Sequence, residues 1–133
     1  MARTETRQDA ARQVKRFLSG YRDGLRQRRS MEAWTTAAGP PDADRARREY
    51  DACARELEAR RRGIREAIEL LRAGSPERAV LGMRYLDGLP WAEIQRLLHM
   101  SRASCFRLHM TALGQLEALL QDRRRDQNEN IET

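Results

Sequence analysis

Apolar side chains in the first part of the chain recur at helical spacing. Over residues 5–29 the spacing is four, three and four residues, with a further position beside the stripe: Val14, Leu18, Tyr21 and Leu25, next to Phe17. The other faces of this segment carry Arg, Gln and Asp. A narrow apolar stripe is typical of a helix that packs against one partner helix. We therefore predict a helix over residues 5–29.

A second stripe of this kind runs through residues 43–73. Its apolar positions recur about every 3.5 residues, and Arg60 interrupts them. They are Ala46, Tyr50, Cys53, Leu57, Ile64, Ala67 and Leu71, with Ile68 beside the stripe near its end. Between the stripes, Gly39-Pro40-Pro41 cannot continue a helix, so we predict a connector over residues 30–42, with Trp34 packed back on the helices. Two amphipathic helices joined in this way predict an antiparallel, coiled-coil-like hairpin over residues 1–73.

The pattern after residue 73 predicts three shorter helices. Gly74 suits a helix end, Ser75 an N-cap and Pro76 a first helical position, so a new domain is expected to begin at residue 74. Helices are predicted over residues 76–86, 90–98 and 102–121, with inward positions Ala79, Val80, Met83, Leu86, Ile94, Leu97, Leu98, Cys105, Leu108, Leu113, Leu116, Leu119 and Leu120. Residues 123–133 lack apolar periodicity and are predicted to form a disordered tail.

Composition agrees with a helical protein. Arg, Ala, Leu, Glu and Gln dominate, and no segment alternates apolar and polar residues for long enough to suggest a sheet. The chain is basic, with a net charge of +6. The excess lies in residues 1–29, which carry nine basic and three acidic side chains, whereas residues 30–73 and 74–133 are each balanced. A basic protein of this size is compatible with a polyanionic partner, but the excess lies outside the last three helices.

The segment from Pro90 to Leu113 has the architecture of a helix-turn-helix. A short helix, a turn of about three residues and a second helix capped by Ser101 follow one another, as in proteins that place the second helix in the major groove. The start of that helix is predicted to point Cys105 and Leu108 inward and to face outward through Arg102, Ala103, Ser104, Phe106, Arg107 and His109. Arg reads guanine or holds phosphate, and the amides behind the Ser101 cap suit a phosphate.

The predicted fold is therefore all-α, with the N-terminal hairpin followed by a three-helix helix-turn-helix domain over residues 74–122. The stretch ERAVLGMRYLDGLPWAEIQRLLHMSRASCFRLHMTALGQL resembles region four of bacterial sigma factors, which binds the minus-35 promoter element. It resembles more closely the sigma-like domain of small phage and prophage transcriptional regulators, including late-gene activators of the ArpU/RinA type. The resemblance covers roughly residues 14–120.

This resemblance implies base or phosphate contacts for four residues of the last helix: Arg102, Ala103, Ser104 and Arg107. It implies that Phe106 contacts a thymine methyl or a sugar edge. Trp91 would touch the DNA backbone or be a buried structural residue. Arg96 would meet a phosphate or remain on the solvated surface.

Three positions depart from the pattern of that family. Gln95 stands where a small residue usually lets the two helices approach, and His99 stands where Gly usually takes a left-handed conformation. Cys105 replaces a branched aliphatic residue of the core. Histidine tolerates the left-handed conformation better than branched residues do, so the same fold is expected, with the geometry between the two helices left open.

Catalysis, cofactors and metals are not predicted. His99 and His109 have no acidic partner at ligand or triad spacing, and the chain has no Gly-rich phosphate loop. Cys53 and Cys105 lie at apolar positions without metal-like neighbours, so both are predicted to be buried, reduced thiols. No signal peptide and no apolar run of membrane length is present, so a cytoplasmic protein without a membrane partner is expected.

The predicted function is sequence-specific binding of double-stranded DNA by a transcriptional regulator encoded by a phage or prophage, with RNA polymerase as a further contact. One alternative is an adaptor that binds RNA polymerase or another protein and has no DNA site of its own. Another is the DNA-recognition subunit of a phage packaging machine, like a small terminase. The apolar stripes over residues 14–25 and 46–71 can pack against each other within one chain or pair between two chains. A homodimer through the N-terminal helices is favoured slightly, because a two-helix hairpin buries little area alone.

Overall fold

The computed structural model describes residues 2–37 and 39–132, and every regular element in these ranges is helical. In chain order the elements are α1 (Ala2–Ala37), α2 (Pro40–Ile68), α3 (Pro76–Leu81), the π-helical turn η1 (Gly82–Leu86), α4 (Trp91–Leu98) and α5 (Arg102–Glu132). The predicted all-α class is confirmed. None of the described helices combines the length and the apolar character needed to cross a membrane.

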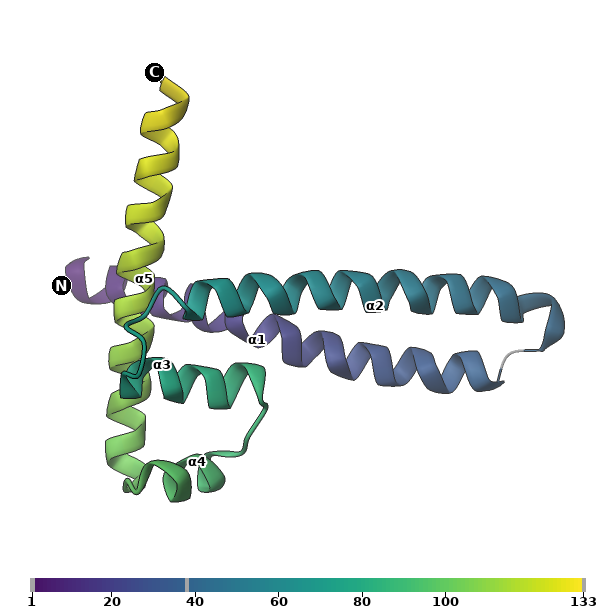
Figure 1. Ribbon diagram of the computed structural model, residues 1–133, viewed down its shortest axis with the longest axis horizontal. Helices are drawn as coiled ribbons and strands as arrows, with labels where there is room; N and C mark the ends of the chain where they lie inside the picture. Colours follow the sequence, from purple (N-terminus) through teal and green to yellow (C-terminus); the bar gives the residue numbers. More distant parts are fainter. Residues whose placement is uncertain (1, 38, 133) are drawn as a thin grey trace.

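α1 and α2 lie side by side and run in opposite directions (Figure 1). Leu18, Leu57 and Ile64, from the two predicted stripes, are buried. Gly24 lets the two helices approach closely, since a Cβ atom at this position would lie 2.5 Å from Cδ1 of Leu57. The two apolar stripes thus pack against each other within one chain, and the homodimer stays a prediction.

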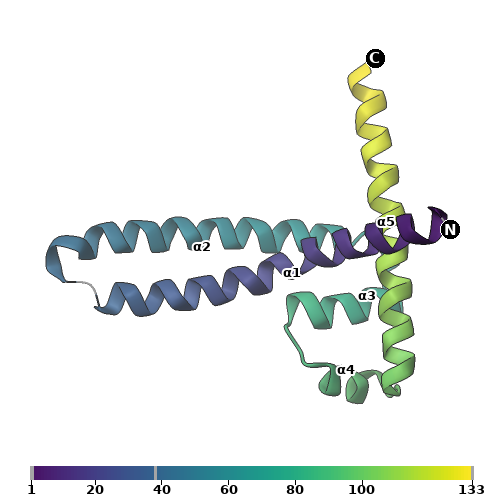
Figure 2. The same ribbon diagram turned by 180° about the vertical axis from the view of Figure 1, so that it is seen from behind.

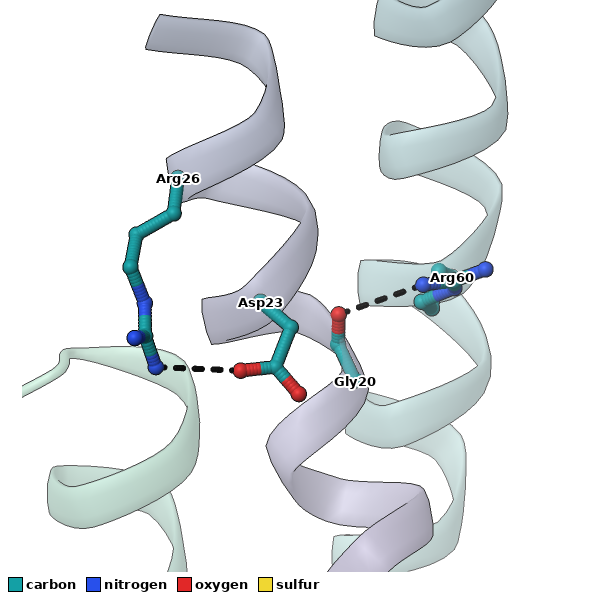
Figure 3. A network of polar contacts seen from close by, with 4 residues as sticks. All are labelled: Gly20, Asp23, Arg26 and Arg60. Carbon is teal, nitrogen blue, oxygen red and sulfur yellow. Dashed lines mark hydrogen bonds and ion pairs between the residues drawn. The ribbon is translucent and has the colours of Figure 1, made fainter. Parts of the chain in front are cut away.

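Arg60, which interrupts the apolar spacing of α2, bonds across the two helices. Its guanidinium Nη1 donates to the carbonyl oxygen of Gly20 on α1 at 3.3 Å (Figure 3). On the other side of α1, Arg26 donates to Asp23 of the same helix at 3.0 Å. The aliphatic part of an Arg side chain can lie along apolar surface while its guanidinium bonds to a carbonyl oxygen. Arg60 is therefore compatible with the packing of α1 against α2.

The connection between α1 and α2 is shorter than predicted. α1 continues through Ala37 and α2 begins at Pro40, so most of the predicted connector over residues 30–42 is helical. Pro is compatible with the first turn of a helix, because its missing N–H would have no intrahelical partner there. The prediction that Trp34 packs back on the helices was wrong: this side chain belongs to the last turns of α1 and is 76% exposed.

α3 begins where the sequence predicted a helix. α2 ends at Ile68, before the predicted end at residue 73, and Gly74 then takes a left-handed conformation with a φ of 78°. The hydroxyl of Ser75 accepts a hydrogen bond from the backbone N–H of Arg78 at 3.2 Å. Pro76 is the first helical residue, so the predicted cap is confirmed.

The helix predicted over residues 76–86 contains a wider turn. α3 passes into η1, in which backbone bonds join residues five positions apart. Such a turn shifts the faces of the side chains that follow it. Within η1, Tyr85 is buried, whereas Met83 and Leu86, from the predicted apolar face, are only partly buried; Leu81, just before the turn, is also buried.

α5 crosses α1, and one buried cluster joins the two long helices to the rest of the chain (Figures 1 and 2). Its members are Val14, Leu18, Ile64, Ala67, Ile68, Leu71, Val80, Leu81, Tyr85, Ile94, Cys105, Ala112, Leu113 and Leu116. The cluster extends across the boundary predicted between residues 73 and 74. Leu97 and Leu119 were predicted to point inward but are exposed, Leu97 because α4 packs only one side against α5 and η1.

α5 is longer than the predicted last helix, which ended at residue 121. It continues to Glu132 and projects past the paired α1 and α2 (Figure 1). The side chains over residues 121–130 are exposed, and Arg and Gln, which favour helices, are frequent among them. The structure therefore differs from the disordered tail predicted over residues 123–133, whose last residue lies outside the described part of the chain.

Candidate nucleic-acid interface

A turn over residues 99–101 joins α4 to α5. His99 has a φ of 54° and a ψ of 43°, and its backbone N–H bonds to the carbonyl oxygen of Arg96 at 3.3 Å. The left-handed conformation predicted at His99 is thereby confirmed. Ser101 caps α5, because its hydroxyl accepts a hydrogen bond from the N–H of Ser104 at 3.1 Å.

The first turns of α5 present one continuous exposed surface, which we term the α5 outer face: Arg102, Ala103, Phe106, Arg107 and Met110. Neighbouring members of this set are one, three or four residues apart, so they follow one side of the helix. Phe106 is 63% exposed although its ring is apolar. The first turns of α5, to which these residues belong, lie beside α4, beyond the point at which α5 crosses α1 (Figures 1 and 2). Four of the residues predicted to contact DNA therefore share an accessible surface.

His109 does not belong to this surface, and its predicted outward orientation was wrong. The side chain is only 4% exposed, and its Nε2 lies 2.7 Å from the hydroxyl of Tyr85. The spacing contained the signal for this burial, because His109 lies four residues after Cys105 and four before Leu113, both of which are buried. Met110, one position further on, takes the exposed place.

Burial keeps both members of the Tyr85–His109 contact neutral. Burial, together with the nearby charges of Lys15 and Arg84, lowers the pKa of His109 to about 4. It raises the pKa of Tyr85 to about 12, against the opposing effect of Arg84 and Arg22. A neutral phenol and a neutral imidazole can share one hydrogen bond in an apolar core without a counter-ion. The contact fixes η1 against α5.

Trp91, at the start of α4, packs between two side chains. The guanidinium of Arg84 lies 4.9 Å from its ring centroid, and the ring of His109 meets it edge to face at 4.8 Å. Arg84 also donates to the carbonyl oxygen of Leu89 at 3.1 Å, which ties down the loop before α4. Trp91 is thus partly buried as a structural residue, although one side of it still reaches the surface pocket described below.

Ser104 orients a basic side chain of the α5 outer face. Its hydroxyl accepts from Arg107 Nη2 at 3.4 Å and from the hydroxyl of Ser101 at 3.0 Å. Ser104 itself is half-buried. Ser104, which is itself bonded to Ser101, therefore helps to orient Arg107, which lowers the entropy that this long side chain would lose on binding.

The basic residues near the turn differ in how far their charge is neutralised. Arg96 is exposed, but its guanidinium bonds twice to the carboxylate of Glu93 one turn earlier, which lowers the pKa of that carboxyl. No carboxylate in the described part of the chain forms an ion pair with Arg102 or Arg107. Arg102 and Arg107 are therefore better placed than Arg96 to meet an anionic ligand.

A surface pocket of about 410 Å³ opens beside Arg102, between the starts of α4 and α5. Its lining is Lys15, Trp91, Ala92, Gln95, Arg102, Phe106 and His109. Gln95, the first of the three unusual positions, contributes to this wall. Lys15 comes from α1, and sequence reasoning missed it because only the crossing of α1 and α5 brings it here. The pocket joins two cations to aromatic side chains and contains no carboxylate, an arrangement suited to an anion.

The described residues form neither a metal site of three or more ligands nor a disulfide. No three His, Cys, Asp or Glu side chains converge there as a metal site would require. Both cysteines are free; Cys105 is buried as predicted, whereas Cys53 is only half-buried. No protein-family model, curated protein or solved structure matches this chain.

Proposed function

We propose that this chain is a sequence-specific, double-stranded DNA-binding transcriptional regulator in which α4, the turn and α5 form a helix-turn-helix. The observation that carries the proposal is the α5 outer face, which is exposed and bears two arginines without an ion pair among the described residues. The short α4, the three-residue turn and the capped start of α5 fit the way such units enter DNA.

In this function the start of α5 enters the major groove. Arg102 and Arg107 are long enough to make paired hydrogen bonds to guanine or to hold a phosphate. Phe106, exposed between them, meets a thymine methyl group or a sugar edge. The backbone amides at the capped start of α5 suit a phosphate. Arg96 would add a phosphate contact only by releasing Glu93.

Selection of bound duplexes from a random DNA library, followed by gel-shift titration, tests the proposal. Arg102→Ala and Arg107→Ala should each weaken binding to the selected duplex by about 1–3 kcal/mol if the residue reads a base. Arg55→Ala is a matched control, because Arg55 is an exposed arginine of α2 away from the outer face. Unchanged affinity and base preference in both α5 variants would rule out the recognition role of α5.

A second candidate function is that of an adaptor for RNA polymerase or another protein. The observation that favours it is the exposed Trp34, in the last turns of α1. This end of α1 lies far from α5 (Figure 1). Trp34 lines a pocket of about 590 Å³ together with Met31 and Ala46. Exposed Trp residues are common at protein interfaces. In the adaptor case a promoter duplex shifts only when polymerase is present, and Trp34→Ala abolishes that shift.

A further inference from the structure

The single lysine of the chain lies in the pocket beside the α5 outer face. Lys15 projects from α1 and shares the lining with Arg102 and Phe106. Its side chain is exposed, and no carboxylate of the described residues pairs with it. The pocket therefore holds two uncompensated positive charges that come from helices far apart in the sequence.

Beyond its pairing with α2, α1 packs against α5 and η1. Arg22, seven residues and about two turns after Lys15, lies on the same side of α1. The positive charge of Lys15 lies near His109 of α5, and that of Arg22 lies near Tyr85 and Arg84 of η1. Packing thus brings Lys15, one basic residue of the segment 1–29, beside the starts of α4 and α5.

We propose that the ammonium group of Lys15 and the guanidinium of Arg102 together bind one backbone phosphate of the DNA duplex that receives α5. This inference rests on the proposed function. In helix-turn-helix complexes the first helix crosses the DNA backbone while the second lies in the groove, so a backbone phosphate is expected beside the starts of both. The pocket lies there, between α4 and α5. Lys serves as a compact point charge for phosphate, and Trp91 and Phe106 line the same pocket.

The salt dependence of binding by the full chain tests this contact. Kd is measured over a range of salt concentrations for the wild type, Lys15→Gln, Lys15→Arg and Arg16→Gln, with the library-selected duplex and with an unrelated duplex. Arg16→Gln is the matched control: it removes one charge from the same turn of α1, and Arg16 is exposed but does not line the pocket. Circular dichroism and Tm establish that each variant is folded.

We expect Lys15→Gln to weaken binding to both duplexes by the same factor and to reduce the slope of log K against log salt by about 1. Its base preference stays that of the wild type, and Lys15→Arg keeps most of the slope. A Lys15→Gln slope equal to that of Arg16→Gln overturns the inference while the proposed function stands. A wild-type chain that binds neither duplex overturns the proposed function, and the phosphate contact with it.

Discussion

His109 occupies a position in the core where an apolar residue would be expected. Its ring is buried against Trp91, and its Nε2 meets the hydroxyl of Tyr85 at 2.7 Å. Burial favours the neutral form of both groups. The contact between η1 and α5 therefore depends on the imidazole of His109 remaining neutral, which makes the folded state sensitive to acid.

The free energy of unfolding should fall as the pH is lowered from about 6.5 to about 4. In this window the unfolded chain protonates His109 at its ordinary pKa of 6.5, whereas the folded chain resists protonation until about pH 4. The slope contributed by this one group reaches up to about 1.4 kcal/mol per pH unit. Urea unfolding at a series of pH values measures it. His109→Gln does not titrate and should show a shallower dependence; equal slopes would contradict the assignment.

Replacement of Tyr85 by Phe should lower the free energy of unfolding by about 1–3 kcal/mol, because it leaves Nε2 of His109 buried without its partner. The double variant Tyr85→Phe/His109→Leu removes both polar groups and should regain part of that loss. Denaturant unfolding of the wild type, both single variants and the double variant completes the cycle. Strictly additive losses would show that the two groups do not stabilise the fold as a pair.

At the scale of single elements, the boundaries that could be predicted are those set by local chemistry. Ser75 and Ser101 each cap the helix that follows, and His99 takes the left-handed conformation expected at the end of α4. The continuation of α1 through Trp34 and the wide turn at η1 have no such local signal. They arise from helix propensity over many residues and from packing of the finished core.

Two glycines within helices should respond oppositely to substitution by Ala. Gly63→Ala should raise the free energy of unfolding by about 0.5–1 kcal/mol, because a Cβ atom there meets nothing within 4 Å and Ala is the better helix former. Gly24→Ala should lower it, because the new Cβ would lie 2.5 Å from Cδ1 of buried Leu57. Thermal unfolding of both variants measures the difference. A stabilised Gly24→Ala protein would show that α1 and α2 do not approach so closely.

At the scale of the whole molecule, the candidate site could be predicted only in part. The residues of the α5 outer face follow from the position of the turn and from helical spacing, and four of its five members were predicted. Lys15 could not be, because its place depends on where α1 crosses α5, a contact between segments far apart in the sequence. For His109 two signals conflict: its polar side chain favours the surface, whereas its spacing from Cys105 and Leu113 favours the core position that it occupies.

The molecule should unfold in a single transition, because Val14 and Leu18 of α1 share a core with Leu113 of α5. Trp34→Phe leaves Trp91 as the only tryptophan, and the exposure of Trp34 means that stability should change little. Urea unfolding followed by Trp91 fluorescence and by far-ultraviolet circular dichroism should give coincident curves. A fluorescence transition at lower urea would instead indicate that the last three helices unfold on their own.

The unbroken course of α1 has a geometric consequence. Lys15 and Trp34 belong to one helix and are nineteen residues apart, which at about 1.5 Å per residue corresponds to roughly 28 Å. This is the length of about eight base pairs of duplex, at roughly 3.4 Å each. If a partner protein binds at Trp34 while Lys15 contacts DNA, α1 therefore fixes the distance between that partner and the DNA.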